Sequence, residues 1–110
     1  MDSPRGIAAP LYSTLAADRA LDDLVELFVD ELPDRVARLQ RLYDADERRE
    51  LERAAHQLKG AAGSYGFDPL TPAAARLENA LATHDPSADV VSALAELIAL
   101  CNRVRAGAPR

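Results

Sequence analysis

Apolar residues recur every three or four positions over the longest patterned stretch of the chain, from Leu21 to Tyr43. This spacing is the period of an amphipathic α-helix and differs from the alternation of a half-buried strand. Asp18 precedes the stretch and is expected to cap its first turn. Pro33 interrupts the pattern without shifting its phase, so we expect one kinked helix or two helices in line. The apolar set comprises Leu21, Leu24, Val25, Leu27, Phe28, Leu32, Val36, Leu39, Leu42 and Tyr43.

Three shorter amphipathic stretches follow, over residues 47–62, 69–81 and 90–104. The first of them ends in a glycine-rich segment, where Gly66 is suited to the left-handed conformation that stops a helix. Asp68 and Pro69 match the N-cap and the first position of the next helix. Short turns separate these stretches, so neighbouring helices are expected to run antiparallel.

Four amphipathic helices predict an all-α fold, an antiparallel up-and-down four-helix bundle. The chain holds 22 Ala and 16 Leu but only 5% aromatic residues, which argues against a β-sandwich or barrel. We expect residues 18–106 to form the bundle, residues 1–17 an N-terminal arm or short extra helix, and residues 107–110 a flexible tail. The arm would pack on the bundle at helical spacing through Leu11, Tyr12 and Leu15.

Charge and cysteine content exclude several classes of function. Thirteen basic residues stand against eighteen acidic ones, and no basic stripe is present to bind a nucleic acid. The single cysteine, Cys101, excludes an internal disulfide, fits a reducing compartment, and lies on an apolar stripe that predicts a core thiol. No apolar run is long enough to span a membrane, and no signal-peptide pattern begins the chain. We therefore expect a cytoplasmic monomer without a membrane partner.

His56 is predicted to face solvent from the second helix. On a helical wheel its side of the helix also carries Arg49, Glu52, Arg53, Lys59, Gly60 and Gly63. The opposite side carries Leu51, Ala54, Leu58, Ala61 and Tyr65. Each glycine in a helix interior costs about 1 kcal/mol relative to alanine, so the bare surface beside the histidine needs an explanation. The glycines either open the imidazole to a bulky partner or let another helix pack closely.

The residue types around His56 suit phosphoryl transfer. A neutral imidazole is a good nucleophile near pH 7, and its attack on phosphorus gives a covalent phosphohistidine. Lys59, three residues on, offers an ammonium to the phosphoryl oxygens. Zinc chemistry lacks support because His56, His84 and Cys101 lie on separate segments, and no metal site is expected. His84 lies in a turn and is expected to be exposed without a role.

The segment from Ala55 to Phe67, AHQLKGAAGSYGF, resembles the signature of histidine-containing phosphotransfer (HPt) domains. Relative to the histidine, that signature has Leu or Ile two positions on, Lys three on, Gly four on, and Gly ten on before an apolar residue. Every position is met. The resemblance implies a phosphorelay intermediate, in which His56 accepts a phosphoryl group from a receiver-domain aspartate or a kinase and donates it to a response-regulator receiver. The partners implied are receiver domains and a sensor histidine kinase.

The same resemblance implies a stand-alone carrier without its own catalytic turnover, which binds no ATP and holds no cofactor. The Mg²⁺ would sit on the partner receiver. It also implies that Glu78, 22 positions after His56, holds the imidazole Nδ1–H and leaves Nε2 as the nucleophile. Two other functions stay open: a helical adaptor that docks or sequesters a receiver or kinase, and an enzyme that uses His56 as a general base. We call the expected partner-binding region around His56 the docking surface; its residues are Arg49, Glu52, Arg53, Gln57, Gly60 and Gly63.

Overall fold

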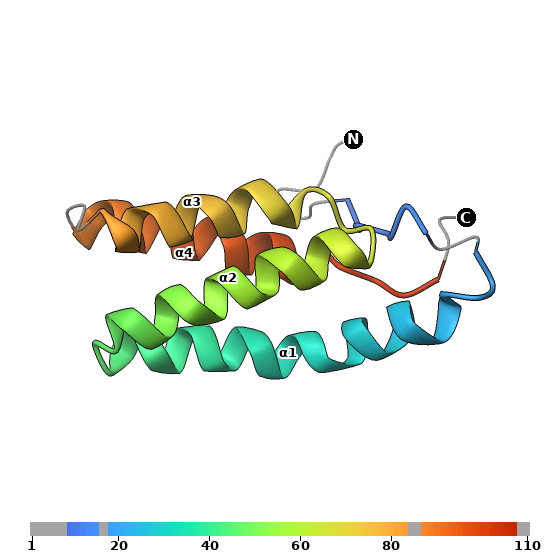
Figure 1. The fold of residues 1–110 in the computed structure, drawn as a ribbon, viewed down its shortest axis with the longest axis horizontal. Coiled ribbons are helices and arrows are strands. Elements are labelled where there is room, and N and C mark those ends of the chain that lie inside the picture. Colours follow the sequence, from blue (N-terminus) through green and yellow to red (C-terminus); the bar gives the residue numbers. More distant parts are fainter. Residues whose placement is uncertain (1–8, 16–17, 84–86, 108–110) are drawn as a thin grey trace.

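The computed structural model describes residues 9–15, 18–83 and 87–107. Its helices are α1 (Asp22–Asp44), α2 (Arg48–Ser64), α3 (Leu70–Ala82) and α4 (Ser87–Cys101). Each helix runs antiparallel to the one before it, and the four close into a bundle in which α1 packs on α2 and α4, and α3 on α2 and α4 (Figure 1). The expected all-α up-and-down four-helix bundle is confirmed.

Leucine, alanine and aromatic side chains fill the centre of the bundle. Phe28 on α1 packs against Tyr65 and Phe67, with ring centroids 5.4 and 5.5 Å apart. Where α2 meets α3, the buried residues alternate between leucine and alanine, which lets these two helices approach closely. The buried members of α2 are Leu51, Ala54, Ala55, Leu58 and Ala62. Burying this stripe determines which side of α2 faces solvent.

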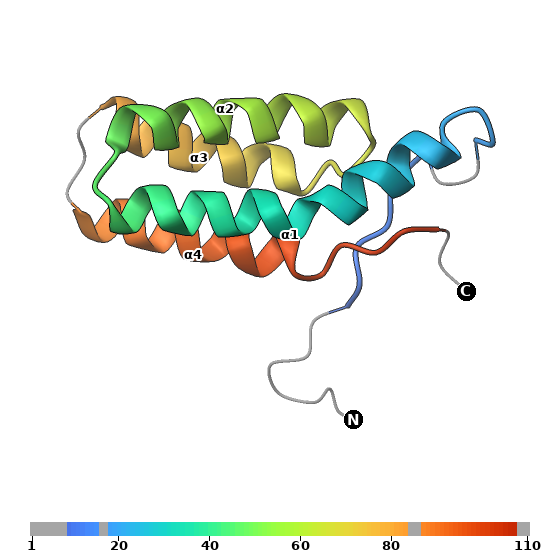
Figure 2. The ribbon, with the colours of Figure 1, turned by 90° about the horizontal axis from the view of Figure 1, so that it is seen from below.

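The first helix is continuous through Pro33, which settles the choice between one helix and two. It begins at Asp22, so the cap expected at Asp18 is wrong: the Asp18 carboxylate accepts the N–H of Ala20 in a turn that precedes the helix. Leu24 and Leu27 are also misassigned to the core stripe. They are 45% and 52% exposed, because this end of α1 projects beyond α2 and α3 (Figure 2).

Two other helix ends differ from the expectation. The third helix begins at Leu70 without a side-chain cap, and the Asp68 carbonyl rather than its carboxylate accepts the N–H of Thr71. The fourth helix ends at Cys101 instead of continuing to Val104. Gly66 has the expected left-handed backbone, with φ of 81°, directly after α2.

Residues 9–15 pack against the bundle in an extended form and not at the helical spacing expected for Leu11, Tyr12 and Leu15. Leu11 pairs with Val104 in an isolated parallel β-bridge: its N–H donates to the Arg103 carbonyl, and its carbonyl accepts from Arg105. Further along, the Thr14 N–H donates to the Gly66 carbonyl over 2.9 Å. A Cβ at Gly66 would lie 2.6 Å from Ser13 Oγ, so the approach of this segment also requires glycine there. The other residues of the expected arm, 1–8 and 16–17, and residues 108–110 of the expected tail lie outside the described residues.

Candidate functional site

His56 projects from the middle of α2 into solvent, as its place on the helical wheel predicts. Its side chain is 66% exposed, whereas its neighbour Ala55 and the next leucine, Leu58, are buried in the core. The helix is therefore anchored on one side by apolar packing and presents the imidazole on the other. His84, the second histidine, lies outside the described residues.

Glu78 on α3 contacts two predicted site residues of α2, His56 and Lys59. One carboxylate oxygen, Oε2, lies 2.9 Å from His56 Nδ1, and the other, Oε1, lies 2.7 Å from Lys59 Nζ. The Lys59 ammonium is the main cause that lowers the pKa of the Glu78 carboxyl, and the bond to His56 lowers it further against an opposing effect of burial. Glu78 is thus a carboxylate at neutral pH and accepts a hydrogen bond from the Nδ1–H of His56.

This arrangement determines which ring nitrogen is free. With the hydrogen on Nδ1 held by Glu78, the lone pair of a neutral imidazole lies on Nε2. The side chain is 66% exposed and Nδ1 is paired with Glu78, so Nε2 is the nitrogen left to approach an external electrophile. The contact between Lys59 and Glu78 was missed by sequence reasoning, which placed the ammonium over the solvent face. Nothing in local spacing relates two side chains on different helices.

Gly60 and Gly63 leave the surface beside the imidazole bare. A Cβ at Gly60 would meet no atom within 4 Å, and one at Gly63 would meet only Thr71 Oγ1, at an ordinary 3.7 Å. Close packing of another helix therefore does not explain Gly60. Of the two explanations offered by the sequence, the space is consistent with access to the imidazole.

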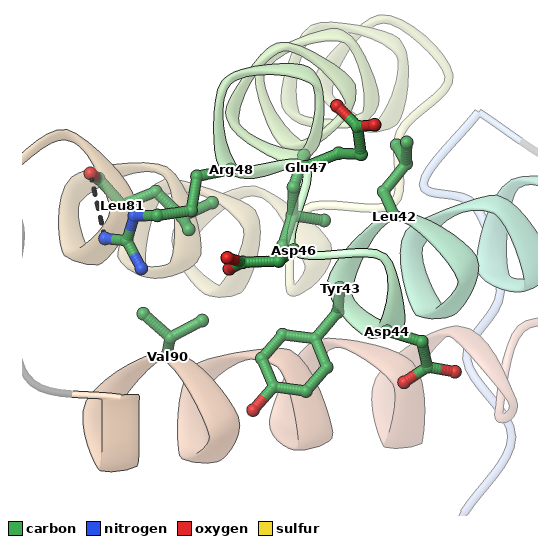
Figure 3. Close-up of a pocket in the computed structure, with 9 residues that line it drawn as sticks. Leu42, Tyr43, Asp44, Asp46, Glu47, Arg48, Leu81 and Val90 are labelled. Carbon is green, nitrogen blue, oxygen red and sulfur yellow. Dashed lines mark hydrogen bonds between the residues drawn. The ribbon is translucent and has the colours of Figure 1, made fainter.

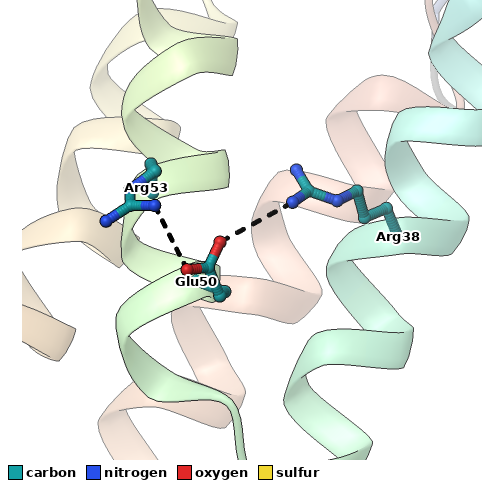
Figure 4. Close-up of polar contacts among 3 residues, drawn as sticks. All are labelled: Arg38, Glu50 and Arg53. Carbon is teal, nitrogen blue, oxygen red and sulfur yellow. Dashed lines mark hydrogen bonds and ion pairs between the residues drawn. The ribbon is translucent and has the colours of Figure 1, made fainter.

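Charged side chains surround His56 on the side toward the start of α2. An open hollow of about 280 Å³ is lined by Arg49, Glu52, Arg53, His56 and Glu78. Next to it, Glu50 lies between Arg53 of its own helix, at 3.2 Å, and Arg38 of α1, at 3.9 Å (Figure 4). Arg38 and Glu50 were absent from the expected docking surface. The spacing of Glu50 and Arg53 was a signal for their pairing, but the contribution from α1 needed the tertiary structure.

A second hollow, of about 300 Å³, lies where α1 turns into α2 (Figure 3). Its walls include Tyr43, Asp46 and Val90, and the Arg48 guanidinium donates to the Leu81 carbonyl there. It contains none of the predicted site residues. Among the described residues, no group of three or more His, Cys, Asp or Glu is placed to hold a metal ion.

The fold and the site define a class of protein: a helical bundle that presents an exposed histidine, backed by a carboxylate, in the middle of one helix. Comparison with protein families gives the same result, because the family model described as the Hpt domain matches residues 23–107 of the 110-residue chain. The chain belongs to the Hpt domain family. No curated protein and no solved structure matches it.

Hpt domains are phosphocarrier modules of two-component signalling, which interact with receiver domains and kinases, so family membership gives this chain a phosphotransfer role. No helix in the described part of the chain has the length and apolar character needed to cross a membrane.

Proposed function

We propose that this chain is a phosphorelay intermediate and that His56 Nε2 carries the phosphoryl group. The observation that carries the proposal is the pairing of Nδ1 with Glu78 at 2.9 Å on an imidazole that is 66% exposed. A nucleophile must be both accessible and in the correct tautomer, and this geometry supports both conditions. The bare surface at Gly60 gives room for a folded donor.

The transfer needs no proton to leave the site. Nε2 attacks the phosphorus of an aspartyl phosphate on a receiver, the P–O bond to the aspartate breaks, and a P–N bond forms. The aspartate departs as a carboxylate. The imidazole keeps its hydrogen on Nδ1 and gains positive charge, which the Glu78 carboxylate stabilises across the hydrogen bond. Donation to a second receiver is the same sequence in reverse.

Lys59 would act on the phosphoryl oxygens, and Glu78 would position it. In the unphosphorylated chain, Nζ lies 2.7 Å from Glu78 Oε1 and is only partly exposed. A phosphoryl group on the ring brings a second anionic acceptor to this ammonium, so we expect Lys59 to be shared between the two. It is a stabilising contact, not the nucleophile.

The proposed partners are response-regulator receivers and a sensor histidine kinase, met in the cytoplasm by a monomeric carrier. Lacking autonomous turnover, the chain would use the Mg²⁺ of the receiver and no cofactor of its own. Its excess of acidic residues disfavours a nucleic-acid partner.

A transfer assay tests the proposal. Receiver domains from the same genome are phosphorylated singly with phosphoramidate, freed of reagent, and mixed with the chain. We expect a label on the chain that is stable to base and labile to acid. His56→Gln should abolish the label, whereas the matched variant His84→Gln should retain it. A wild-type chain that binds a receiver and takes no label would instead be an adaptor. Labelling that survives His56→Gln would contradict the assignment of His56.

A further inference from the structure

Two exposed leucines on α1 are not explained by the fold. Leu24 and Leu27 are 45% and 52% exposed, and they lie on the end of α1 that extends past α2 and α3 in Figure 2. Among the described residues, the only other large apolar side chain so exposed is Val91 on α4. Single exposed leucines are ordinary, but two within one helical turn make a patch that a partner can cover.

The leucines lie on the side of α1 that borders α2. One turn after Leu24, Phe28 contacts Tyr65 at the end of α2, and further along this stripe Arg35 and Arg38 line a narrow groove against α2. The opposite side of α1 carries Val29 and Val36, which line a hollow with residues at the end of α4 and just after it: Cys101, Asn102, Val104 and Arg105. At 100° per residue, Leu27 and Val29 lie on opposite sides of Phe28. Leu27 therefore points away from the α4 side.

On α2, uncharged residues lie between these leucines and His56, while the neighbouring stripe of α1 carries the Glu31–Arg35 ion pair. The exposed part of α2 between them consists of Gly60, Gly63 and Ser64, with Ala61 half-buried beside them. Seven residues of helix, about 10 Å, separate His56 from Gly63. A typical interface covers about 800 Å² on each partner, a disc of roughly 16 Å radius. Phe28 lies opposite Tyr65, nine residues after His56, and Leu24 lies one turn beyond Phe28, so about 20 Å of bundle separates Leu24 from His56. This is less than the roughly 32 Å diameter of such a disc, so one interface can cover both His56 and the α1 leucines.

The two ends of this surface differ in charge. The leucines are flanked only by acids: residues 22–34 hold Asp22, Asp23, Glu26, Asp30, Glu31 and Asp34 and no basic residue. Beyond His56 in the other direction, three arginines stand with two glutamates: Arg38, Arg49 and Arg53, with Glu50 bound to the first and last of them, and Glu52. Val91 does not border the docking surface, because it lies on α4, which has no contact with α2.

We propose that Leu24 and Leu27 are a second contact of the docking surface and that they fix the orientation of the receiver over His56. The partner that fits is a receiver with an apolar patch rimmed by basic residues opposite the leucines and acidic residues opposite the arginines. One end carries acids alone and the other carries more arginines than glutamates, and this asymmetry disfavours the reversed orientation. This inference rests on the proposed phosphorelay function.

The test compares Leu24→Gln/Leu27→Gln with the matched control Val91→Gln. Glutamine is as good a helix former as leucine, so unfolding should be unchanged in the double variant. Phosphoramidate alone should label His56 equally in all three chains, because this small donor needs no docking. Transfer to a receiver that accepts from the wild type, measured below saturation, should be at least tenfold slower for the double variant and unchanged for Val91→Gln. Leu24→Met/Leu27→Met should restore it.

Each contrary result has a distinct meaning. Wild-type transfer by Leu24→Gln/Leu27→Gln overturns the leucine contact and leaves the proposed function intact, as does an equal loss in Val91→Gln. If the wild type forms dimers that the double substitution abolishes while transfer is unaltered, the leucines serve self-association and the receiver contact is overturned. A wild-type chain that is labelled by phosphoramidate but passes the group to no receiver overturns the proposed function and this inference together.

Discussion

Replacing Gly60 with leucine should raise the stability of the free chain and impair its transfer reaction. A Cβ at Gly60 meets nothing within 4 Å, and the residue is exposed, so we expect the substitution to carry no steric cost in the free chain. Glycine in a helix interior is about 0.8–1 kcal/mol worse than alanine, and leucine ranks just below alanine. We therefore expect the free energy of unfolding to rise by about 0.8 kcal/mol, and the melting temperature by about 4 °C for a domain of this size.

In the complex, the same four carbons would occupy space next to the imidazole that a docked receiver needs. A loss of tenfold or more in the rate of transfer corresponds to about 1.4 kcal/mol, a modest value for a clash at an interface centre. Urea unfolding followed by circular dichroism gives the stability, and rapid-quench measurement of label on each protein gives the rate. Ala99→Leu adds bulk at an exposed position of α4. It is the matched control and should transfer the phosphoryl group normally.

Two outcomes would refute this reasoning. Unchanged transfer by Gly60→Leu would show that the bare surface is not needed for access. A clear loss of stability would show that Gly60 is required by packing, in contradiction to the open space around it.

Three further predictions concern Lys59, Glu78 and Cys101. Lys59→Ala should slow transfer several-fold and shorten the phosphohistidine lifetime, because one charge-assisted contact to the phosphoryl oxygens is lost. Rapid quench measures both. Complete loss of transfer would show that Lys59 is essential to the reaction and does more than stabilise the product. Since the pKa of Glu78 is lowered in the fold, its ion pair stabilises the fold above the unfolded-state pKa of 4.5, and this contribution disappears as the pH falls through the lower folded-state value. Urea titrations of wild type and Glu78→Gln should therefore differ at pH 6, by no more than about 1 kcal/mol, and converge near pH 3; a difference that grows in acid would contradict the pair. Burial raises the pKa of the Cys101 thiol to about 12, so Ellman's reagent should react only in urea, and rapid reaction of the native chain would show that the thiol is not buried.

Helix content and order followed from the sequence because burial of one face imposes a period of 3.6 residues on each segment. The helix ends did not follow, because they depend on backbone partners elsewhere in the chain. Asp18 and Asp68 are residues of a type that commonly caps helices. In the structure their backbone carbonyls accept the N–H groups of Leu21 and Thr71, and neither α1 nor α3 has a side-chain cap. The bridge between Leu11 and Val104 joins the two ends of the described chain, and no local pattern encodes it.

Part of the candidate site was likewise predictable from the sequence, and part was not. The exposure of His56 and the bare surface at Gly60 follow from the register of α2, which its leucines determine. The position of Glu78 opposite the imidazole was implied by family resemblance and not by periodicity. Its simultaneous contact with Lys59 was not anticipated, because it depends on the close approach of α2 and α3. Leu24 and Leu27 were placed in the core because spacing alone does not say where a neighbouring helix stops.

The central claim is that His56 carries the phosphoryl group on Nε2 because Glu78 holds Nδ1. Nuclear magnetic resonance of the chain, labelled with ¹⁵N at histidine and phosphorylated by a receiver, tests it directly. We expect ³¹P coupling to Nε2 of His56, with the Nδ1 proton retained. Coupling to Nδ1, or a phosphoryl group on any other residue, would contradict the account.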